Sequence, residues 1–379
     1  MSLIQTNFIE KKPYMSNNIN SKKKIVSLAP GRICLFGDHQ DYLGLPVIAC
    51  AIDRTIKLTA VQNSSSVFKL NMLDIDEIRN IDINDTFPVL EPRDYFASSL
   101  RVLRRHGCIP SVGYDITITG NIPINSGTSS SSALLIAWIK FLVEAYGVKD
   151  AVTPEFISEI GHASEVLEHG EPGGMMDHYS IGVGHIVHIK TSEPYVCSVI
   201  GTRMKGLISG VSGVPKETIG VLGDLKGNAL MAIDIIRQNF PDFDLHNTEV
   251  IDLKKYTTFL PDQLIPYFEG AIKNHHFTKE ALKEFKKPKL DLKKIGELMN
   301  GHHAVLRDLL KITVPRIDDM IDAALEAGAY GAKIVGSGGG GSIVAIAEPG
   351  NEEQVIKAIK AAGAKEAYSV SVDPGARIL

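Results

Sequence analysis

The sequence predicts a two-domain fold that mixes strands and helices, and three observations support this prediction. The chain has 379 residues, which is enough for two domains of ordinary size. Hydrophobic residues make up 44% and charged residues 22%, as in folded globular proteins. The pattern changes near residue 200, where helical periodicity becomes dominant. We therefore expect a flexible extension over residues 1–23, an N-terminal domain over 24–200 and a C-terminal domain over 201–379.

Charge and cysteine content argue against several classes of protein. The formal net charge of −4, with both signs mixed along the chain, gives no reason to expect binding to nucleic acid or to an anionic membrane. We find neither a secretory signal nor a run of about 18 apolar residues. The four cysteines form no C-x-x-C pair and are too few for a disulfide framework. We expect a cytoplasmic protein.

The N-terminal domain is predicted to alternate between strands and helices. Alternating or β-branched residues predict strands beginning at residue 25 and over 47–61, 67–72, 114–119 and 182–189. Helical spacing of apolar residues predicts helices over 94–106, 133–146 and 153–169. Thr153 is expected to cap the last of these, with Pro154 in its first turn.

The C-terminal domain is predicted to be mainly helical before it ends in a short sheet. Helices are predicted over 228–237, 263–273, 292–310 and 316–327. The closing segments read as strand, glycine loop, strand, helix and strand, at 332–335, 336–341, 342–347, 352–362 and 368–372. Lys333 and the basic residues between 279 and 289 are expected on solvated faces.

A loop of small residues precedes the apolar helix predicted over 133–146. It comprises Gly127, Thr128, Ser129, Ser130, Ser131 and Ser132. The first amides of a helix lack internal partners, so small side chains there would let phosphate oxygens approach, and a serine hydroxyl can bind Mg²⁺. A serine-rich linker or an elaborate helix cap is the alternative. No Walker A sequence is present, so any phosphate site is of another type.

The glycine loop at 336–341 has five glycines in six positions. It satisfies G-x-G-x-x-G, but a strand follows where a dinucleotide fold needs a helix. A tight turn between two strands is one interpretation. Close approach of its backbone, at Gly338 and Gly339, to the other phosphate-binding loop is the functional one.

Two further segments carry polar side chains suited to catalysis. Residues 31–42 include Arg32, Asp38, His39 and Asp41, which could grip sugar hydroxyls or could form a solvated turn.

In the segment 162–177, His162, Glu165 and His169 share one face of the predicted helix, but no H-E-x-x-H zinc motif is present. A simpler interpretation gives Glu165 to Mg²⁺ and lets Asp177 face a substrate.

These segments, in this order, resemble the GHMP kinase superfamily, and within it the galactokinase family. The resemblance rests on residues 29–42, 123–133, 163–177, 298–307 and 331–341. It implies an α+β two-domain fold, with an N-terminal domain like ribosomal protein S5 domain 2, a ferredoxin-like C-terminal domain and the active site between them.

The resemblance also implies an ATP- and Mg²⁺-dependent sugar kinase that phosphorylates the anomeric C1 hydroxyl of galactose or a related sugar. Asp177 would be the catalytic base, with Arg32 beside it. The sugar would be bound by Asp38, His39, Asp41 and Gly174. The nucleotide would be bound by Gly127, Ser129, Ser130, Ser131, Ser132, Gly338 and Gly339, and Mg²⁺ by Ser131 and Glu165.

Three departures from the galactokinase pattern bear on the substrate. Asp38 replaces the usual glutamate, Leu45 replaces a glycine, and residues 214–218 stand where a Tyr-Arg-Arg segment is usual. They weaken the identity of the sugar, so a kinase for arabinose, an N-acetylhexosamine, a uronic acid or another pentose or hexose is the first alternative. A non-catalytic sugar sensor is the second. A mevalonate kinase is the third, and the carboxylates of Asp38 and Asp41 disfavour it because they would repel an anionic substrate. The oligomeric state is left open.

Overall fold

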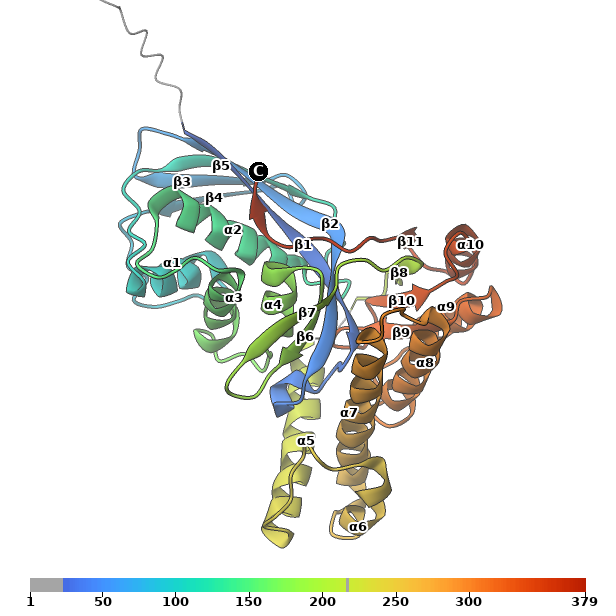
Figure 1. Ribbon diagram of the computed structural model, residues 1–379. Coiled ribbons are helices and arrows are strands. Elements are labelled where there is room, and N and C mark those ends of the chain that lie inside the picture. Colours follow the sequence, from blue (N-terminus) through green and yellow to red (C-terminus); the bar gives the residue numbers. More distant parts are fainter. Residues whose placement is uncertain (1–22, 216–217) are drawn as a thin grey trace, which may run out of the picture.

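The computed structural model describes residues 23–215 and 218–379, so nearly all of the extension predicted over 1–23 lies outside the described residues. The fold has two domains, and each consists of one β-sheet packed against helices. The two domains form the two lobes in Figure 1. This is an α+β fold of two domains, as predicted.

The first sheet belongs mainly to the N-terminal half. Its strands are β1 (Lys24–Phe36), β2 (Val47–Gln62), β3 (Val67–Met72), β4 (Glu77–Asp82), β5 (Tyr114–Gly120), β6 (Ile186–Lys190), β7 (Val196–Gly201) and β12 (Arg377–Ile378). The order is β12-β1-β2-β5-β3-β4, and β6 pairs with the first part of β2 and with β7. All pairings are antiparallel except that of β3 with β5.

Four helices cover the first sheet: α1 (Tyr95–Arg105), α2 (Ser130–Tyr146), α3 (Pro154–His162) and α4 (Met176–Val183). The predicted cap at Thr153 is confirmed, because its side chain accepts a hydrogen bond from the Phe156 amide. In the core, the indole of Trp138 lies edge-on to the ring of Phe68, with centroids 5.1 Å apart. Trp138 is one of the buried apolar residues of α2, and burial of these residues stabilises the packing of the helix on the sheet.

The helix predicted over 153–169 is confirmed: α3 continues without a break into the π-helical turn η2 (Ala163–Leu167). One sequence prediction here is wrong. The strand predicted from residue 182 begins at Ile186, because the preceding residues finish α4, which ends at Gly184 with φ 76°. The alternation of apolar and polar residues that predicted this strand begins within the last turn of α4. The end of that helix is set by tertiary packing, which the alternation does not reveal.

The second sheet has the antiparallel order β11-β8-β10-β9. Its strands are β8 (Leu207–Val211), β9 (Gly331–Val335), β10 (Ser342–Ile346) and β11 (Glu366–Ser369), packed on α8 (Leu292–Asp308), α9 (Pro315–Glu326) and α10 (Glu352–Ala361). The predicted strand–glycine loop–strand hairpin is confirmed as β9 and β10.

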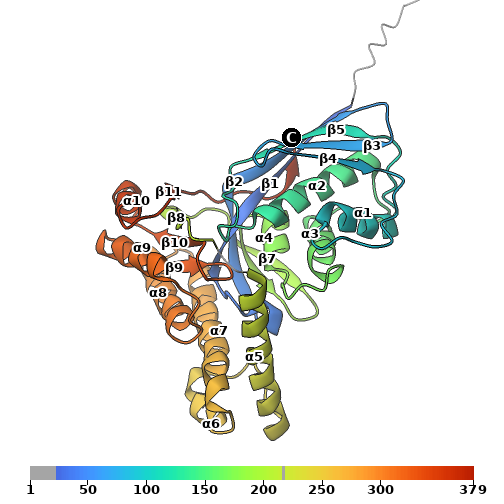
Figure 2. The same ribbon diagram turned by 180° about the vertical axis from the view of Figure 1, so that it is seen from behind.

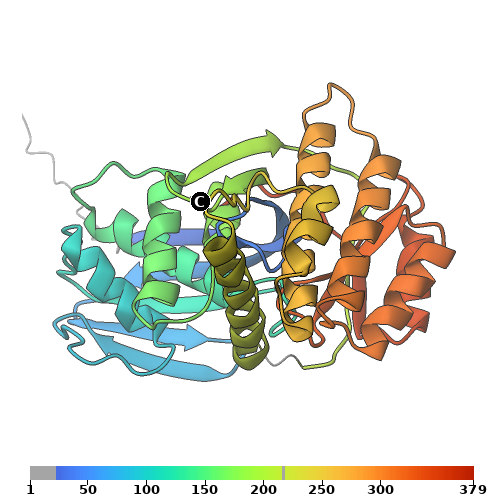
Figure 3. The ribbon, with the colours of Figure 1, turned by 90° about the horizontal axis from the view of Figure 1, so that it is seen from below.

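A helical arm projects from the second domain (Figures 1 and 2). It is built from α5 (Thr218–Asn239), α6 (Leu253–Thr257) and α7 (Ile265–Phe285), with the short helices η3 (Val250–Asp252) and η4 (Asp262–Leu264). Figure 3 shows α5 between the helices of the N-terminal half and α7. Leu45, which replaces a glycine of the galactokinase pattern, is fully buried in the core of this arm.

The last residues of the chain return to the first sheet. Val372 forms a bridge with Ile52, and β12 pairs with β1. This return passes Gly184, where an added Cβ would lie 2.2 Å from the Pro374 carbonyl carbon. The close approach fastens the C-terminal segment to the end of α4.

We predict that Gly184→Ala destabilises the protein much more than Gly147→Ala. Both glycines have positive φ, 76° and 73°, so each alanine would cost about 1–2 kcal/mol of backbone strain. Only Gly184 is crowded, because a Cβ at Gly147 would meet nothing within 4 Å. Urea denaturation of both variants measures the difference. Equal losses of unfolding free energy would show that the C-terminal return does not press on α4.

Candidate active site

A cavity of about 650 Å³ opens where the two domains meet. Its walls come from the end of β1, the serine loop, η2, the start of α4, α5 and the glycine loop. The predicted site residues that line it are Arg32, Asp38, His39, Asp41, Gly127, Ser129, Ser130, Ser131, Ser132, Glu165, Gly174 and Asp177.

An ion pair between Arg32 and Asp177 lies at the centre of the cavity. Arg32 comes from the buried strand β1, and its Nε lies 2.6 Å from Oδ1 of Asp177 in the first turn of α4. The same guanidinium donates to the Gly127 carbonyl, and the Ser129 hydroxyl donates to Oδ2 of Asp177. Burial raises the pKa of Asp177, but Arg32 and these hydrogen bonds outweigh it and hold the pKa at about 2. Asp177 is therefore a carboxylate at any ordinary pH.

The N-terminus of α2 faces this ion pair. Ser129 occupies the N-cap position with φ 58°, but its side chain makes no capping hydrogen bond because its hydroxyl contacts Asp177. The Ser129 side chain therefore does not cap α2, which argues against the interpretation of the serine loop as an elaborate helix cap. A 17-residue helix begins here, and its first amides and its dipole offer a site for an anion.

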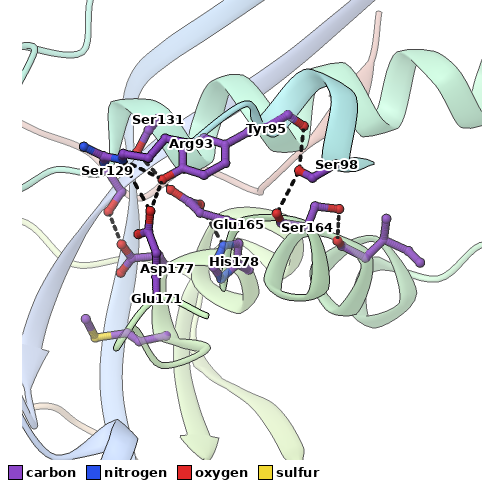
Figure 4. A network of polar contacts seen from close by, with 12 residues as sticks. Arg93, Tyr95, Ser98, Ser129, Ser131, Ser164, Glu165, Glu171, Asp177 and His178 are labelled. Atoms are coloured by element: carbon purple, nitrogen blue, oxygen red, sulfur yellow. Dashed lines mark hydrogen bonds and ion pairs between the residues drawn. The ribbon is translucent and has the colours of Figure 1, made fainter. Parts of the chain in front are cut away.

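Ser131 and Glu165 lie side by side on the wall of the cavity (Figure 4). The Ser131 hydroxyl donates to Oε1 of Glu165 at 3.1 Å, and His178 Nε2 lies 2.8 Å from Oε2. Glu165 comes from the π-helical turn η2 and is 8% exposed. These are hard oxygen ligands of the kind that Mg²⁺ prefers. His178 was not among the predicted residues, although it directly follows Asp177 in the chain.

Arg93, Tyr95 and Glu171 form a second network (Figure 4), of which Arg93 and Glu171 line the cavity. Arg93 Nε donates to the Tyr95 hydroxyl at 2.9 Å, and this hydroxyl donates to Glu171 Oε1 at 2.9 Å. Arg93 also lies 3.4 Å from Glu171. Sequence reasoning missed this group, because the three residues have no common motif and converge only in space.

Another part of the cavity is formed by the loop that follows β1. His39 is buried with φ 61°, its Nδ1 lies 3.3 Å from the Tyr42 hydroxyl, and its Nε2 has no partner within the described part of the chain. Gly174 lies directly against Asp41 of the short helix η1 (Asp41–Leu43), since an added Cβ would come within 2.0 Å of Oδ2. Burial, followed by the charge of Asp177, raises the pKa of Asp41 to about 6.

Asp38 lines the cavity, but its carboxylate is occupied by protein groups. Oδ2 lies 2.6 Å from Lys333 Nζ, and Oδ1 accepts from the Gly336 amide at 3.2 Å. The prediction that Lys333 lies on a solvated face is wrong, because its side chain is fully buried. A lysine in the middle of the apolar strand at 331–335 was the signal for such burial. Lys283 and Lys287, in contrast, are exposed as predicted.

The glycine loop meets the serine loop through Gly127 and Gly336. An added Cβ at Gly127 would lie 2.7 Å from the Val335 carbonyl oxygen, and one at Gly336 would lie 3.1 Å from the Gly127 Cα. Gly336 and Ser337 line the cavity. Gly338 and Gly339 are not among the lining residues: Gly338 packs on Ile312, and the Gly339 amide donates to the Ile312 carbonyl at 2.7 Å.

Residues of α5 just beyond the segment 214–218, which stands where galactokinases have Tyr-Arg-Arg, also reach the cavity. Gly220 and Leu222 of α5 line it, and Lys226 Nζ lies 5.9 Å from the centre of the Tyr42 ring. An apolar residue and a glycine thus stand on this wall.

Residues 23–215 and 218–379 lack two features. They contain no group of three or more His, Cys, Asp or Glu residues gathered to hold a metal ion. They also contain no helix that is both long enough and apolar enough to cross a membrane.

Three family models match the chain. The model of the GHMP kinases N-terminal domain matches residues 94–185, the GHMP kinases C-terminal model matches 279–365, and the galactokinase galactose-binding signature matches 16–60. Arg32, Asp38, His39 and Asp41, which line the cavity, thus belong to the segment that the galactose-binding signature matches.

Several individual proteins are similar to this chain over nearly its whole length. A mevalonate kinase from Thermococcus sibiricus is 26% identical, covering 90% of this chain and 94% of the relative. A galactokinase from Exiguobacterium sibiricum is also 26% identical, covering 92% of each chain. The crystal structure of Lactococcus lactis galactokinase complexed with galactose superposes with a TM-score of 0.84 at 22% identity, covering 95% of this chain and 96% of that one.

We predict that Asp41→Asn stabilises the ligand-free protein at pH 8 but not at pH 4. A carboxyl whose folded-state pKa is raised to about 6 costs stability once pH exceeds its unfolded value of about 3.9, and the full cost is reached above pH 6. The expected gain at pH 8 is of the order of 2 kcal/mol. Thermal denaturation at both pH values measures it. A gain that is the same at pH 4 and pH 8 would contradict the assigned cause.

Proposed function

We propose that this chain, which belongs to the GHMP kinase superfamily of ATP-dependent kinases, transfers the γ-phosphoryl group of ATP to the anomeric C1 hydroxyl of galactose or a related sugar. One observation carries the proposal. The uncapped start of α2, which suits a phosphate group, and the ionised Asp177, which suits a hydroxyl group, share one cavity and are joined by Ser129.

The serine loop is the proposed site of the triphosphate. Gly127 is close enough to the glycine loop that a side chain there would collide with backbone, and small residues continue through Ser132. Amide hydrogens at a helix start stabilise negative charge without having to reorganise. Gly338 and Gly339, which are held by Ile312 and do not line the cavity, would act only by shaping the glycine loop.

The donor set at Ser131 and Glu165 fits Mg²⁺. A hydroxyl and a buried carboxylate meet at 3.1 Å, and His178 holds the second carboxylate oxygen in place. When bound, Mg²⁺ would neutralise charge on the phosphates. Ser131 and Glu165 would hold it, and His178 would keep Glu165 oriented.

Asp177 is proposed to accept the proton of the attacking hydroxyl. The hydroxyl oxygen would form a bond to the γ-phosphorus while the bond to the leaving ADP oxygen breaks, and the hydroxyl proton would pass to Asp177. Arg32 keeps this carboxylate ionised and in a fixed orientation. Because the pKa of Asp177 is low, we expect the proton to transfer only as the new bond to phosphorus forms.

The part of the cavity lined by His39, Asp41 and Gly174, which we call the acceptor half, fits a neutral sugar better than an anionic substrate. His39 and Asp41 both line the cavity, and the Asp41 carboxylate lies directly against Gly174. Arg32 and Arg93, which line the cavity, are already paired with Asp177 and Glu171. A substrate carboxylate, such as that of mevalonate, would be repelled by Asp41, whereas sugar hydroxyls would donate to it.

The test is ADP release with ATP and Mg²⁺ across a panel of galactose, arabinose, N-acetylgalactosamine, galacturonic acid and mevalonate. We expect galactose or a closely related neutral sugar to give the highest kcat/KM. Turnover of mevalonate alone would overturn the sugar assignment. Binding of galactose and ATP without any turnover would favour the sugar sensor.

We predict that Asp177→Asn lowers kcat by about 10²–10⁴, the range for loss of a general base. The amide keeps the shape of the side chain and one acceptor for Arg32, so galactose affinity measured by calorimetry should change little. A melting temperature close to that of the wild type is the control for folding. Near-normal turnover would remove Asp177 from this role.

A further inference from the structure

Lys333 is a fully buried cation in the middle of strand β9. A buried ammonium group is costly unless charge and hydrogen bonds compensate it. Its Nζ lies 2.6 Å from Asp38 Oδ2 and donates to the Cys34 carbonyl at 3.0 Å. The contact therefore joins the C-terminal sheet to the end of β1.

The carboxylate of Asp38 also contacts the glycine loop. Its Oδ1 accepts from the Gly336 amide at 3.2 Å. Burial raises the pKa of Asp38, but Lys333 outweighs this effect and lowers it, so Asp38 is ionised. His302 lies beside the pair, stacked on Phe36, and burial lowers its pKa to about 3, so it is neutral. Lys333 therefore supplies the charge that balances Asp38.

The loop of residues 38–45, which we call the acceptor loop, needs external support. His39 has a left-handed backbone, which residues other than glycine keep only when their surroundings hold them. Two further supports come from the C-terminal domain: Asn274 of α7 donates to the Asp38 carbonyl at 3.4 Å, and Gln40 donates to Thr278 of α7 at 3.3 Å. The N-terminal domain supplies the loop and holds its end, where Thr191 donates to the Leu45 carbonyl at 2.8 Å, and the C-terminal domain holds its beginning.

We propose that Lys333 is a positioning residue: through Asp38, it fixes the acceptor loop so that His39 and Asp41 face the substrate. Asp38 then acts as the link in this chain of contacts and does not itself grip a sugar hydroxyl. The proposal deepens the function proposed above, since it assigns roles within the same cavity.

The test compares Lys333→Met with the double variant Asp38→Asn/Lys333→Met. The single variant leaves an unpaired carboxylate and should lose melting temperature, and the double variant should recover most of it because both charges are gone. Amide hydrogen exchange of a peptide covering residues 36–45 is the main readout in ligand-free protein. We expect faster exchange in both variants, and a rise of roughly tenfold or more in the KM for galactose in both.

Arg377→Met is the matched control. Arg377 pairs with the buried Asp373 at 2.8 Å, and neither residue lines the cavity. This variant should lose melting temperature without changing exchange of the acceptor loop or the KM for galactose.

Two results would overturn the proposal. One is unchanged exchange of residues 36–45 in Lys333→Met. The other is a double variant that recovers loop protection together with its melting temperature, since charge balance alone would then explain the pair. If the wild-type protein does not turn over galactose, the proposed function fails, while the exchange comparison still decides the role of Lys333.

Discussion

The ion pair between Arg32 and Asp177 is the interaction on which the cavity depends. One guanidinium holds the carboxylate of α4 and the Gly127 carbonyl of the serine loop, so it joins segments that are far apart in the chain. Because Asp177 is an anion, the Ser129 hydroxyl donates a hydrogen bond to it and does not cap α2. The helix start then stays uncapped by that side chain, and its amides face the cavity. The same contact thus shapes both the proposed base and the proposed anion site.

The carboxylates around the cavity differ in what surrounds them, and this separates their roles. Asp177 is paired with arginine, Glu165 is bound by a hydroxyl and an imidazole, and Asp38 is paired with a buried lysine. No cation among the described residues pairs with Asp41, so burial raises its pKa to about 6. Similar chemical groups therefore serve as proposed base, metal ligand, structural link and hydroxyl acceptor because their neighbours differ.

The acceptor half of the cavity is shared between the domains. Its residues lie between β1 and β2 of the first sheet, but Lys333 of β9 and Asn274 and Thr278 of α7 hold them. The C-terminal return adds a second tie, because β12 pairs with β1. A site built in this way needs both domains packed together, which explains why its parts are dispersed along nearly the whole sequence.

The sequence by itself determined the elements with strong local signals and the chemistry of the loops. Caps such as Thr153, the β9–β10 hairpin, the serine loop and the candidates Glu165 and Asp177 could all be recognised, because each depends on neighbours within a few residues. Only the tertiary structure decided which groups pair. Asp38 and Gly336 are 298 residues apart in the chain, and the burial of Lys333 follows from packing between domains. Charge pairing and burial depend on distance in space, which periodicity and local propensity do not encode.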